Sequence, residues 1–289
     1  MHDYSAGHIS TAESHRIIAT LNEKLANDRF RFHPGVSYRH LFVLKGDAAI
    51  RETVPPHDYI DKFVTSFWRC YEESGLKEVM LAAREILSNH PVNIERTKNG
   101  LSPANAIWLW GEGKTPDLPS IYEEYGMNGA LISAVDLLKG IGVCAGLEII
   151  NVPGATGYLD TNYKGKAEAA IAAAREKDLV FVHVEAPDEA GHQGLCRKKV
   201  QAIEDFDQKI VQPVWDGLAA AGFDFRLVVA MDHFTPLSLK THVDKPVPIA
   251  IYDSSDDETG SGLKYTEANA AGVNKLLENG KRFFEILTQ

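Results

Sequence analysis

Cysteine is scarce in this sequence, and its few cysteines are not spaced for cross-linking. The 289 residues include 3 cysteines, which are Cys70, Cys144 and Cys196. No two of them form a Cys-x-x-Cys pair. Disulfide frameworks and cysteine-based zinc sites both need cysteines at closer, regular spacings. The pattern therefore disfavours both and is typical of reduced thiols in a cytoplasmic protein.

Long apolar runs are also missing. No stretch approaches the roughly 20 apolar residues that a membrane-spanning helix needs. The first residues, MHDYSAGHIS, lack the charged-then-apolar pattern of a secretory signal. We therefore expect a cytoplasmic protein without a membrane partner.

Positive charge is in deficit. Lysine and arginine total 30 against 40 aspartates and glutamates, which gives a formal net charge of −10. Nucleic-acid-binding proteins usually present a basic face, so we expect no nucleic-acid partner. An acidic average still permits a local basic pocket, which an anionic substrate would need.

The first hundred residues predict a small α+β domain. Ile17, Ile18, Leu21 and Leu25 recur at helical spacing within Thr11–Asn27. The next expected elements are a strand at Val36–Leu44, a turn at Gly46-Asp47, a returning strand at Ala48–Val54, and helices at Tyr59–Glu73 and Leu76–Asn89.

The pattern changes near Lys98-Asn99-Gly100. After it, short apolar runs alternate with helical patterns. The runs are Ala106–Trp110, Ala130–Ser133, Leu147–Asn151, Leu179–Val184, Leu227–Met231 and Val247–Tyr252. The helical patterns are Ser120–Tyr125, Ala134–Leu138, Lys164–Lys177, Arg197–Ala221 and Thr266–Leu287. This alternation predicts an α/β domain over residues 101–289, with a doubly wound, mostly parallel sheet, next to the smaller domain over residues 1–100.

Acidic and imidazole side chains collect just after predicted strands. Asp188 and His192 follow the strand that ends near Val184. Asp232 and His233 come directly after the strand at 227–231, and His242 precedes the last strand. Open α/β sheets bind ligands outside the carboxyl ends of their strands, so these side chains are expected to meet there.

Each of these residues alone is most often part of a turn, a helix cap or a hydrogen-bonded pair. Together, imidazole and carboxylate groups suit Zn²⁺, Mn²⁺ and related divalent ions. Five candidates are too many for one three-ligand site and favour a pair of metals, the arrangement common in phosphoryl transfer. His183, by contrast, is interpreted first as a hydrogen-bonded core residue.

Several longer motifs resemble a known family. Three segments are similar to the metal-binding motifs of the alkaline phosphatase superfamily: PDEAGH at 187–192, MDHF at 231–234 and THVDKPVPI at 241–249. Others resemble the archaeal-type, 2,3-bisphosphoglycerate-independent phosphoglycerate mutases: DYSAGHIS at 3–10, PGVSYRHL at 34–41, PPHD at 55–58, WLWGEG at 108–113, SAVDLLKGIG at 133–142 and PGATGYLDTNY at 153–163. The likeness runs from about Asp3 to Tyr252.

The resemblance implies an activity and a set of ligands. The family interconverts 3-phosphoglycerate and 2-phosphoglycerate through a phosphoserine intermediate, with two divalent ions (Mn²⁺, Zn²⁺, Co²⁺ or Mg²⁺) and without 2,3-bisphosphoglycerate. The resemblance implies that Asp188, His192 and His242 hold one ion, and that Asp232 and His233 help hold the other. The smaller domain would bind phosphoglycerate, and the candidate residues there are Arg39, His40, His8, His57 and Asp58. Arginine offers a planar fork that fits a carboxylate or a phosphate.

One part of the family pattern has no match. Family members carry an aspartate metal ligand and the serine nucleophile ahead of the segment that matches DYSAGHIS, which here begins at residue 3. We therefore expect this chain alone to lack the nucleophile and one ligand of the second metal. We also expect it to expose apolar sheet surface, which would favour pairing with a separate N-terminal polypeptide.

Two other interpretations stay open. The metal motifs would fit equally well in a metal-dependent phosphatase or phosphonate hydrolase of the same superfamily, although the SYRH and DYSAGH motifs favour the mutase. The chain could also be a non-catalytic, metal-binding half of a split mutase. A kinase is disfavoured because no Walker-type loop is present.

Overall fold

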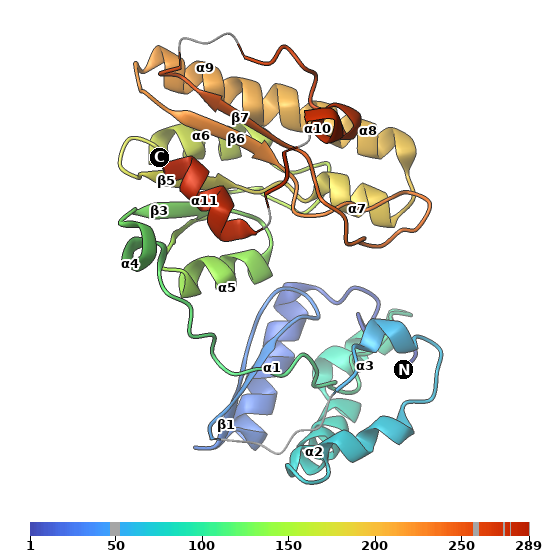
Figure 1. The fold of residues 1–289 in the computed structure, drawn as a ribbon. Helices are drawn as coiled ribbons and strands as arrows, with labels where there is room; N and C mark the ends of the chain where they lie inside the picture. Colours follow the sequence, from blue (N-terminus) through green and yellow to red (C-terminus); the bar gives the residue numbers. More distant parts are fainter. Residues whose placement is uncertain (47–52, 257–259, 274, 278, 289) are drawn as a thin grey trace. The chain divides into compact units, whose positions relative to one another are not determined.

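A computed structural model describes residues 1–46, 53–256, 260–273, 275–277 and 279–288 (Figure 1). Its contacts divide the chain into two units, Met1–Thr115 and Pro116–Gln289. The sequence placed this boundary at residue 100, but the segment after it is tied to the first unit. Asn93 donates to the carbonyl of Ala104, and Tyr71 donates to that of Leu109. No helix in the described part of the chain is long and apolar enough to cross a membrane.

The first unit is a helical layer on a two-stranded antiparallel sheet. Its elements are α1 (Thr11–Leu25), β1 (Phe30–His33), β2 (Leu41–Leu44), η1 (Pro56–Tyr59), η2 (Thr65–Tyr71), α2 (Leu76–Ser88) and α3 (Pro91–Lys98). Ser10 and Glu13 form a capping box that starts α1. The apolar face of α1 then packs on Phe30 and Phe32, in one buried cluster with α2 and α3.

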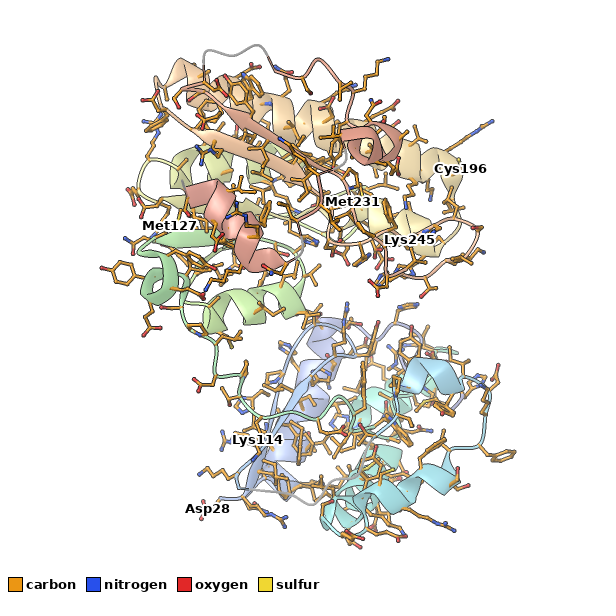
Figure 2. All side chains as sticks on the ribbon, in the orientation of Figure 1. Asp28, Lys114, Met127, Cys196, Met231 and Lys245 are labelled. Atoms are coloured by element: carbon orange, nitrogen blue, oxygen red, sulfur yellow. The ribbon has the colours of Figure 1, made fainter. Side chains whose placement is uncertain are left out.

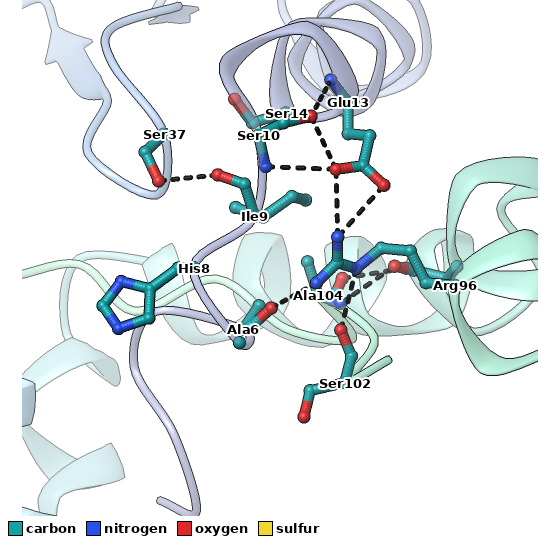
Figure 3. A network of polar contacts seen from close by, with 12 residues as sticks. Ala6, His8, Ile9, Ser10, Glu13, Ser14, Ser37, Arg96, Ser102 and Ala104 are labelled. Carbon is teal, nitrogen blue, oxygen red and sulfur yellow. Dashed lines mark hydrogen bonds and ion pairs between the residues drawn. The ribbon is translucent and has the colours of Figure 1, made fainter. Parts of the chain in front are cut away.

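A buried arginine joins the parts of this unit (Figure 3). The Arg96 side chain is 4% exposed and forms two hydrogen bonds, of 3.0 and 2.9 Å, with the Glu13 carboxylate. The same guanidinium donates to the carbonyl of Ala6 at 2.6 Å and to that of Ser102 at 2.8 Å. The N-terminal loop, α1, α3 and the segment after α3 therefore share one polar centre.

Two strand predictions in this unit were wrong. Only Leu41–Leu44 of the predicted strand at 36–44 is a strand, and its partner is β1, with Phe30 opposite Leu44. Ala106–Trp110 forms no strand, since its backbone and side chains bond instead to other parts of the unit, as Trp108 does to the carbonyl of Val54. Asp47 of the predicted turn at Gly46-Asp47 and most of Ala48–Val54 lie outside the described residues.

The second unit is built on α/β alternation. Its elements are α4 (Ile121–Tyr125), β3 (Gly129–Ile132), α5 (Asp136–Cys144), β4 (Glu148–Ile150), α6 (Tyr163–Ala173), β5 (Leu179–Val182), α7 (Ala186–His192), α8 (Cys196–Phe206), η3 (Asp207–Val211), α9 (Gln212–Ala220), β6 (Arg226–Ala230), β7 (Ile249–Asp253), α10 (Glu267–Val273) and α11 (Gly280–Thr288). Strands β4, β3 and β5 lie in that order and form a parallel sheet, and a mostly parallel sheet was predicted.

Helices cover both faces of the parallel sheet. On one face, Leu131 and Ile149 lie so close to α5 that a Cβ on Gly142 would fall within 2.9 Å of their side chains. On the other face, Ile132, Val180 and Val182 pack in one cluster with α6, η3 and α9. This three-layer packing confirms the α/β class predicted from the alternating runs.

Three details differ from the sequence prediction. Strands β6 and β7 are antiparallel, because residues 231–248 between them contain no crossover helix. The helix expected at 197–221 is interrupted by the π-helical segment η3, and the pattern at 266–287 forms two short helices, α10 and α11. Helix α7 was not predicted, although it carries two of the proposed ligands.

Candidate metal centre

Helix α7 positions the first two ligand candidates. Asp188 and His192 are four residues apart, so their side chains lie on the same face of the helix. Pro187 stands in the first turn, where its missing N–H removes no helical hydrogen bond. A Cβ on Gly191 would lie 2.7 Å from the carbonyl oxygen of Thr235, so only glycine allows α7 to pack this closely on the segment after β6.

The His192 ring is oriented by a backbone contact. Its Nδ1 lies 2.9 Å from the carbonyl oxygen of Lys240, an arrangement in which Nδ1–H donates and the lone pair of Nε2 is free for a metal. Lys240 has a φ of +54°, a left-handed conformation that is uncommon for a residue with a side chain. Such strain persists where the surroundings require it, and it gathers at functional sites.

Asp188, His192 and His242 meet at one point. The Nε2 atoms of His192 and His242 are 3.0 Å apart. The Asp188 carboxylate lies 3.2 Å from His192 Nε2 and 3.4 Å from His242 Nε2. Ligand atoms held by a tetrahedral ion at about 2.1 Å would be about 3.4 Å from one another. The three groups therefore already have nearly the spacing that one divalent ion requires.

His233 lies beside this group and links it to Asp232. Its ring centroid is 3.6 Å from that of His242, and its Nδ1 is 4.0 Å from the Asp188 carboxylate. On its other side, Nε2 is 3.2 Å from the carboxylate of Asp232. Asp232 follows Met231, which is labelled in Figure 2, and its side chain is 70% exposed. The Asp232–His233 pair thus offers a second set of ligand atoms next to the first.

Among the residues that the structure describes, Asp188, His233 and His242 present ligand atoms within 4.8 Å of one another. The donor set is rich in imidazole, which suits Zn²⁺ and neighbouring transition ions, whereas Mg²⁺ prefers oxygen ligands and retained water. The chemistry and spacing of the donors therefore fit a divalent metal. All five predicted ligands belong to this one region of the second unit.

Thr235 is a contact of this centre that sequence reasoning missed. Its side chain is buried, and its hydroxyl donates to Asp188 while lying 3.3 Å from His233 Nδ1. Its own carbonyl accepts from the Lys199 ammonium at 2.6 Å. A threonine three residues after an aspartate carries no signal by itself. Its position two residues after Asp232-His233 was the hint that the sequence offered.

The predicted substrate-binding residues belong to the first unit. Tyr38 contacts two of them: the His8 ring centroid is 6.5 Å from its own, and the Arg39 guanidinium lies 5.2 Å above its ring. Both His8 and Arg39 are exposed. His40 is half-buried, and its Nδ1 accepts the N–H of Gly35 at 3.0 Å. Burial lowers the pKa of His40, and the nearby His15 acts in the same direction.

Two further candidates, His57 and Asp58, belong to η1, but their side chains lie outside the described residues. His183, interpreted as a core residue, contacts Ser133 and Glu185 through its two ring nitrogens.

Comparisons with known proteins identify the family of this chain. The model of the Metalloenzyme superfamily matches residues 40–276. A probable 2,3-bisphosphoglycerate-independent phosphoglycerate mutase of Geobacter sulfurreducens is 46% identical over 288 residues, which cover 99% of this chain and 72% of the relative. The 2,3-bisphosphoglycerate-independent phosphoglycerate mutase of Methanosarcina acetivorans is 51% identical over 270 residues, covering 91% of this chain and 66% of the relative.

Solved structures show the same fold. A Pyrococcus horikoshii protein has a TM-score of 0.69 at 23% identity, covering 86% of this chain and 61% of its own. The cofactor-independent phosphoglycerate mutase of Thermoplasma acidophilum has a TM-score of 0.60 at 25% identity, covering 98% of this chain and 72% of its own. The chain thus spans about two thirds of the length of the proteins that it matches.

Proposed function

The chain belongs to the cofactor-independent phosphoglycerate mutases of the Metalloenzyme superfamily, and we propose that it serves the interconversion of 3-phosphoglycerate and 2-phosphoglycerate. The observation that carries this proposal is the convergence of Asp188, His192 and His242 from two segments that are distant in sequence. A cytoplasmic location and independence from 2,3-bisphosphoglycerate form part of the same proposal.

The metal ligands have separate roles in this proposal. Asp188, His192 and His242 would hold one divalent ion, and Asp232 with His233 would help hold a second. When bound, such ions lower the pKa of a hydroxyl nucleophile and offset the charge of the transferring phosphoryl group. The protein orients the ligands: the Lys240 carbonyl fixes the ring of His192, and the Thr235 hydroxyl holds the carboxylate of Asp188.

The first unit would bind the anionic substrate. Arg39 and His8 flank Tyr38 at the surface, so a carboxylate or phosphate there would meet a guanidinium and an imidazole. We propose His8 and Arg39 as the main contacts. His40, whose Nδ1 is occupied by the Gly35 N–H, would support the turn that presents Arg39. Roles for His57 and Asp58 stay predictions.

An enolase-coupled assay with 3-phosphoglycerate and Mn²⁺ tests the proposal, with bound metal counted by mass spectrometry on the same sample. Turnover that His192→Ala abolishes would support the mutase and would show that the predicted absence of the nucleophile is wrong. Tightly held metal without turnover would support the metal centre and the prediction that the nucleophile lies outside this chain.

Two outcomes would count against the mutase. Release of inorganic phosphate without isomerisation would favour the phosphatase alternative. A chain that folds but binds no divalent ion would overturn the assignment of the ligands. An Asp244→Asn variant provides a control, because Asp244 is an exposed carboxylate two residues after His242 and is not among the proposed ligands.

A further inference from the structure

A partly buried polar network lies where strand β5 passes into helix α7. Its most buried member is Lys166 of α6, which is 0% exposed and whose ammonium donates to the carbonyl of His183 at 2.9 Å. Ser133, which follows β3, is 3% exposed. Burial lowers the pKa of Lys166, while the charge of Glu185 acts in the opposite direction. A charged group in such a place is costly unless its partners hold it well.

The ring of His183 connects two other members of this network. Its Nδ1 is 3.2 Å from the hydroxyl of Ser133, and its Nε2 is 2.9 Å from the carboxylate of Glu185. The Ser133 oxygen already accepts the N–H of Val135, so its own proton can be donated to Nδ1. His183 then donates Nε2–H to Glu185, and each group in the chain of contacts has a partner.

Glu185 carries the effect of this network to the metal ligands. It is the last residue before α7, and its backbone carbonyl accepts the N–H of Asp188 at 2.9 Å and that of Glu189 at 3.2 Å. The side chain of Glu185 is therefore held by His183, while its main chain holds the first turn of the helix that bears Asp188 and His192.

We propose that Lys166, His183 and Glu185 are positioning residues of the metal centre, which fix the junction between β5 and α7 and so set the orientation of Asp188 and His192. The proposal rests on the metal site proposed above. Buried ionic groups are often no better for stability than apolar side chains of similar volume. A role in geometry therefore explains this network better than a role in stability.

Binding of Co²⁺ to the purified chain tests the proposal, because the visible absorption of Co²⁺ reports the geometry of its ligands. We expect Glu185→Ala and Lys166→Met to weaken Co²⁺ binding by about tenfold and to shift its absorption bands. Glu185→Gln keeps an oxygen that accepts from His183, so it should restore the bands and most of the affinity. Lys164→Met and Glu168→Ala are matched controls, since each breaks an exposed ion pair on α6, the helix that carries Lys166.

Unchanged affinity and unchanged bands in folded Glu185→Ala protein would overturn the proposal and leave the network with a structural role only. If Lys166→Met fails to fold, the Co²⁺ affinities and absorption bands of Glu185→Ala and Glu185→Gln still decide whether the network positions the metal ligands. A failure of the unaltered chain to bind Co²⁺ would overturn the metal site itself, so the two proposals fail in different ways.

Discussion

Replacing Thr235 by valine removes one hydroxyl from the candidate metal centre and keeps the shape of the side chain. The hydroxyl donates to Asp188, whose side chain is 21% exposed, so water can replace only part of that bond. A hydrogen bond to a charged group contributes about 1.5–3 kcal/mol. Loss of a group that orients a metal ligand typically weakens binding by about 10–100-fold, or about 1.4–2.7 kcal/mol. We therefore expect Thr235→Val to raise the Kd for Zn²⁺ or Mn²⁺ by that factor.

Competition with a chromophoric chelator measures this change directly. Thr235→Ser keeps the hydroxyl and should bind metal nearly as well as the unaltered chain. Thr241→Val is the matched control, because Thr241 is exposed and directly precedes His242. If Thr235→Val is folded and its Kd equals that of Thr241→Val, the hydroxyl does not orient Asp188 and the reasoning is wrong.

Three other predictions concern both units. Arg96→Met should destabilise the first unit by about 1.5–3 kcal/mol, because it removes the hydrogen bonds of a buried guanidinium to the Glu13 carboxylate and to the carbonyl of Ala6; denaturant unfolding measures this, and a loss below that of Ser10→Ala would contradict it. Gly191→Ala should separate α7 from Thr235 and weaken metal binding, whereas Gly140→Ala on α5, with open space around it, should have no effect. Burial, with Arg16 and Lys24 nearby, lowers the pKa of His90, so the unfolded chain takes up its proton first; stability should fall as pH drops below about 6.5, and less steeply in His90→Asn.

The sequence predicted that the candidate ligands lie together, because the residue types and their order along the chain carry that information. Asp188, His192 and His242 follow or precede apolar runs that are strands, and strand ends gather at one edge of a sheet. Helix α7, which carries Asp188 and His192, was not predicted. It has only 7 residues, and it includes Pro187 and Gly191, residue types that disfavour the interior of a helix.

Other features depend on contacts that no local pattern reveals. Thr235 matters through its hydroxyl contact with Asp188. Lys240 matters because its backbone adopts a left-handed conformation and its carbonyl contacts the ring of His192. Strand β1 is only four residues long, and its alternation of buried and exposed residues is too brief to recognise. Strand β7 likewise runs antiparallel to β6 because residues 231–248 contain no helix that could form a crossover connection.

The Arg96 centre has a consequence for how the first unit folds. Ala6 and Arg96 are 90 residues apart in the chain, and Glu13 and Arg96 are 83 apart, so these contacts close very long loops. Contacts of this kind form late, because the entropy of the intervening chain must be lost before they add stability. During synthesis the DYSAGH segment leaves the ribosome before Arg96, so the hydrogen bond from Arg96 to the Ala6 carbonyl forms only after Arg96 emerges. Its final turn is thus completed near the end of the folding of this unit.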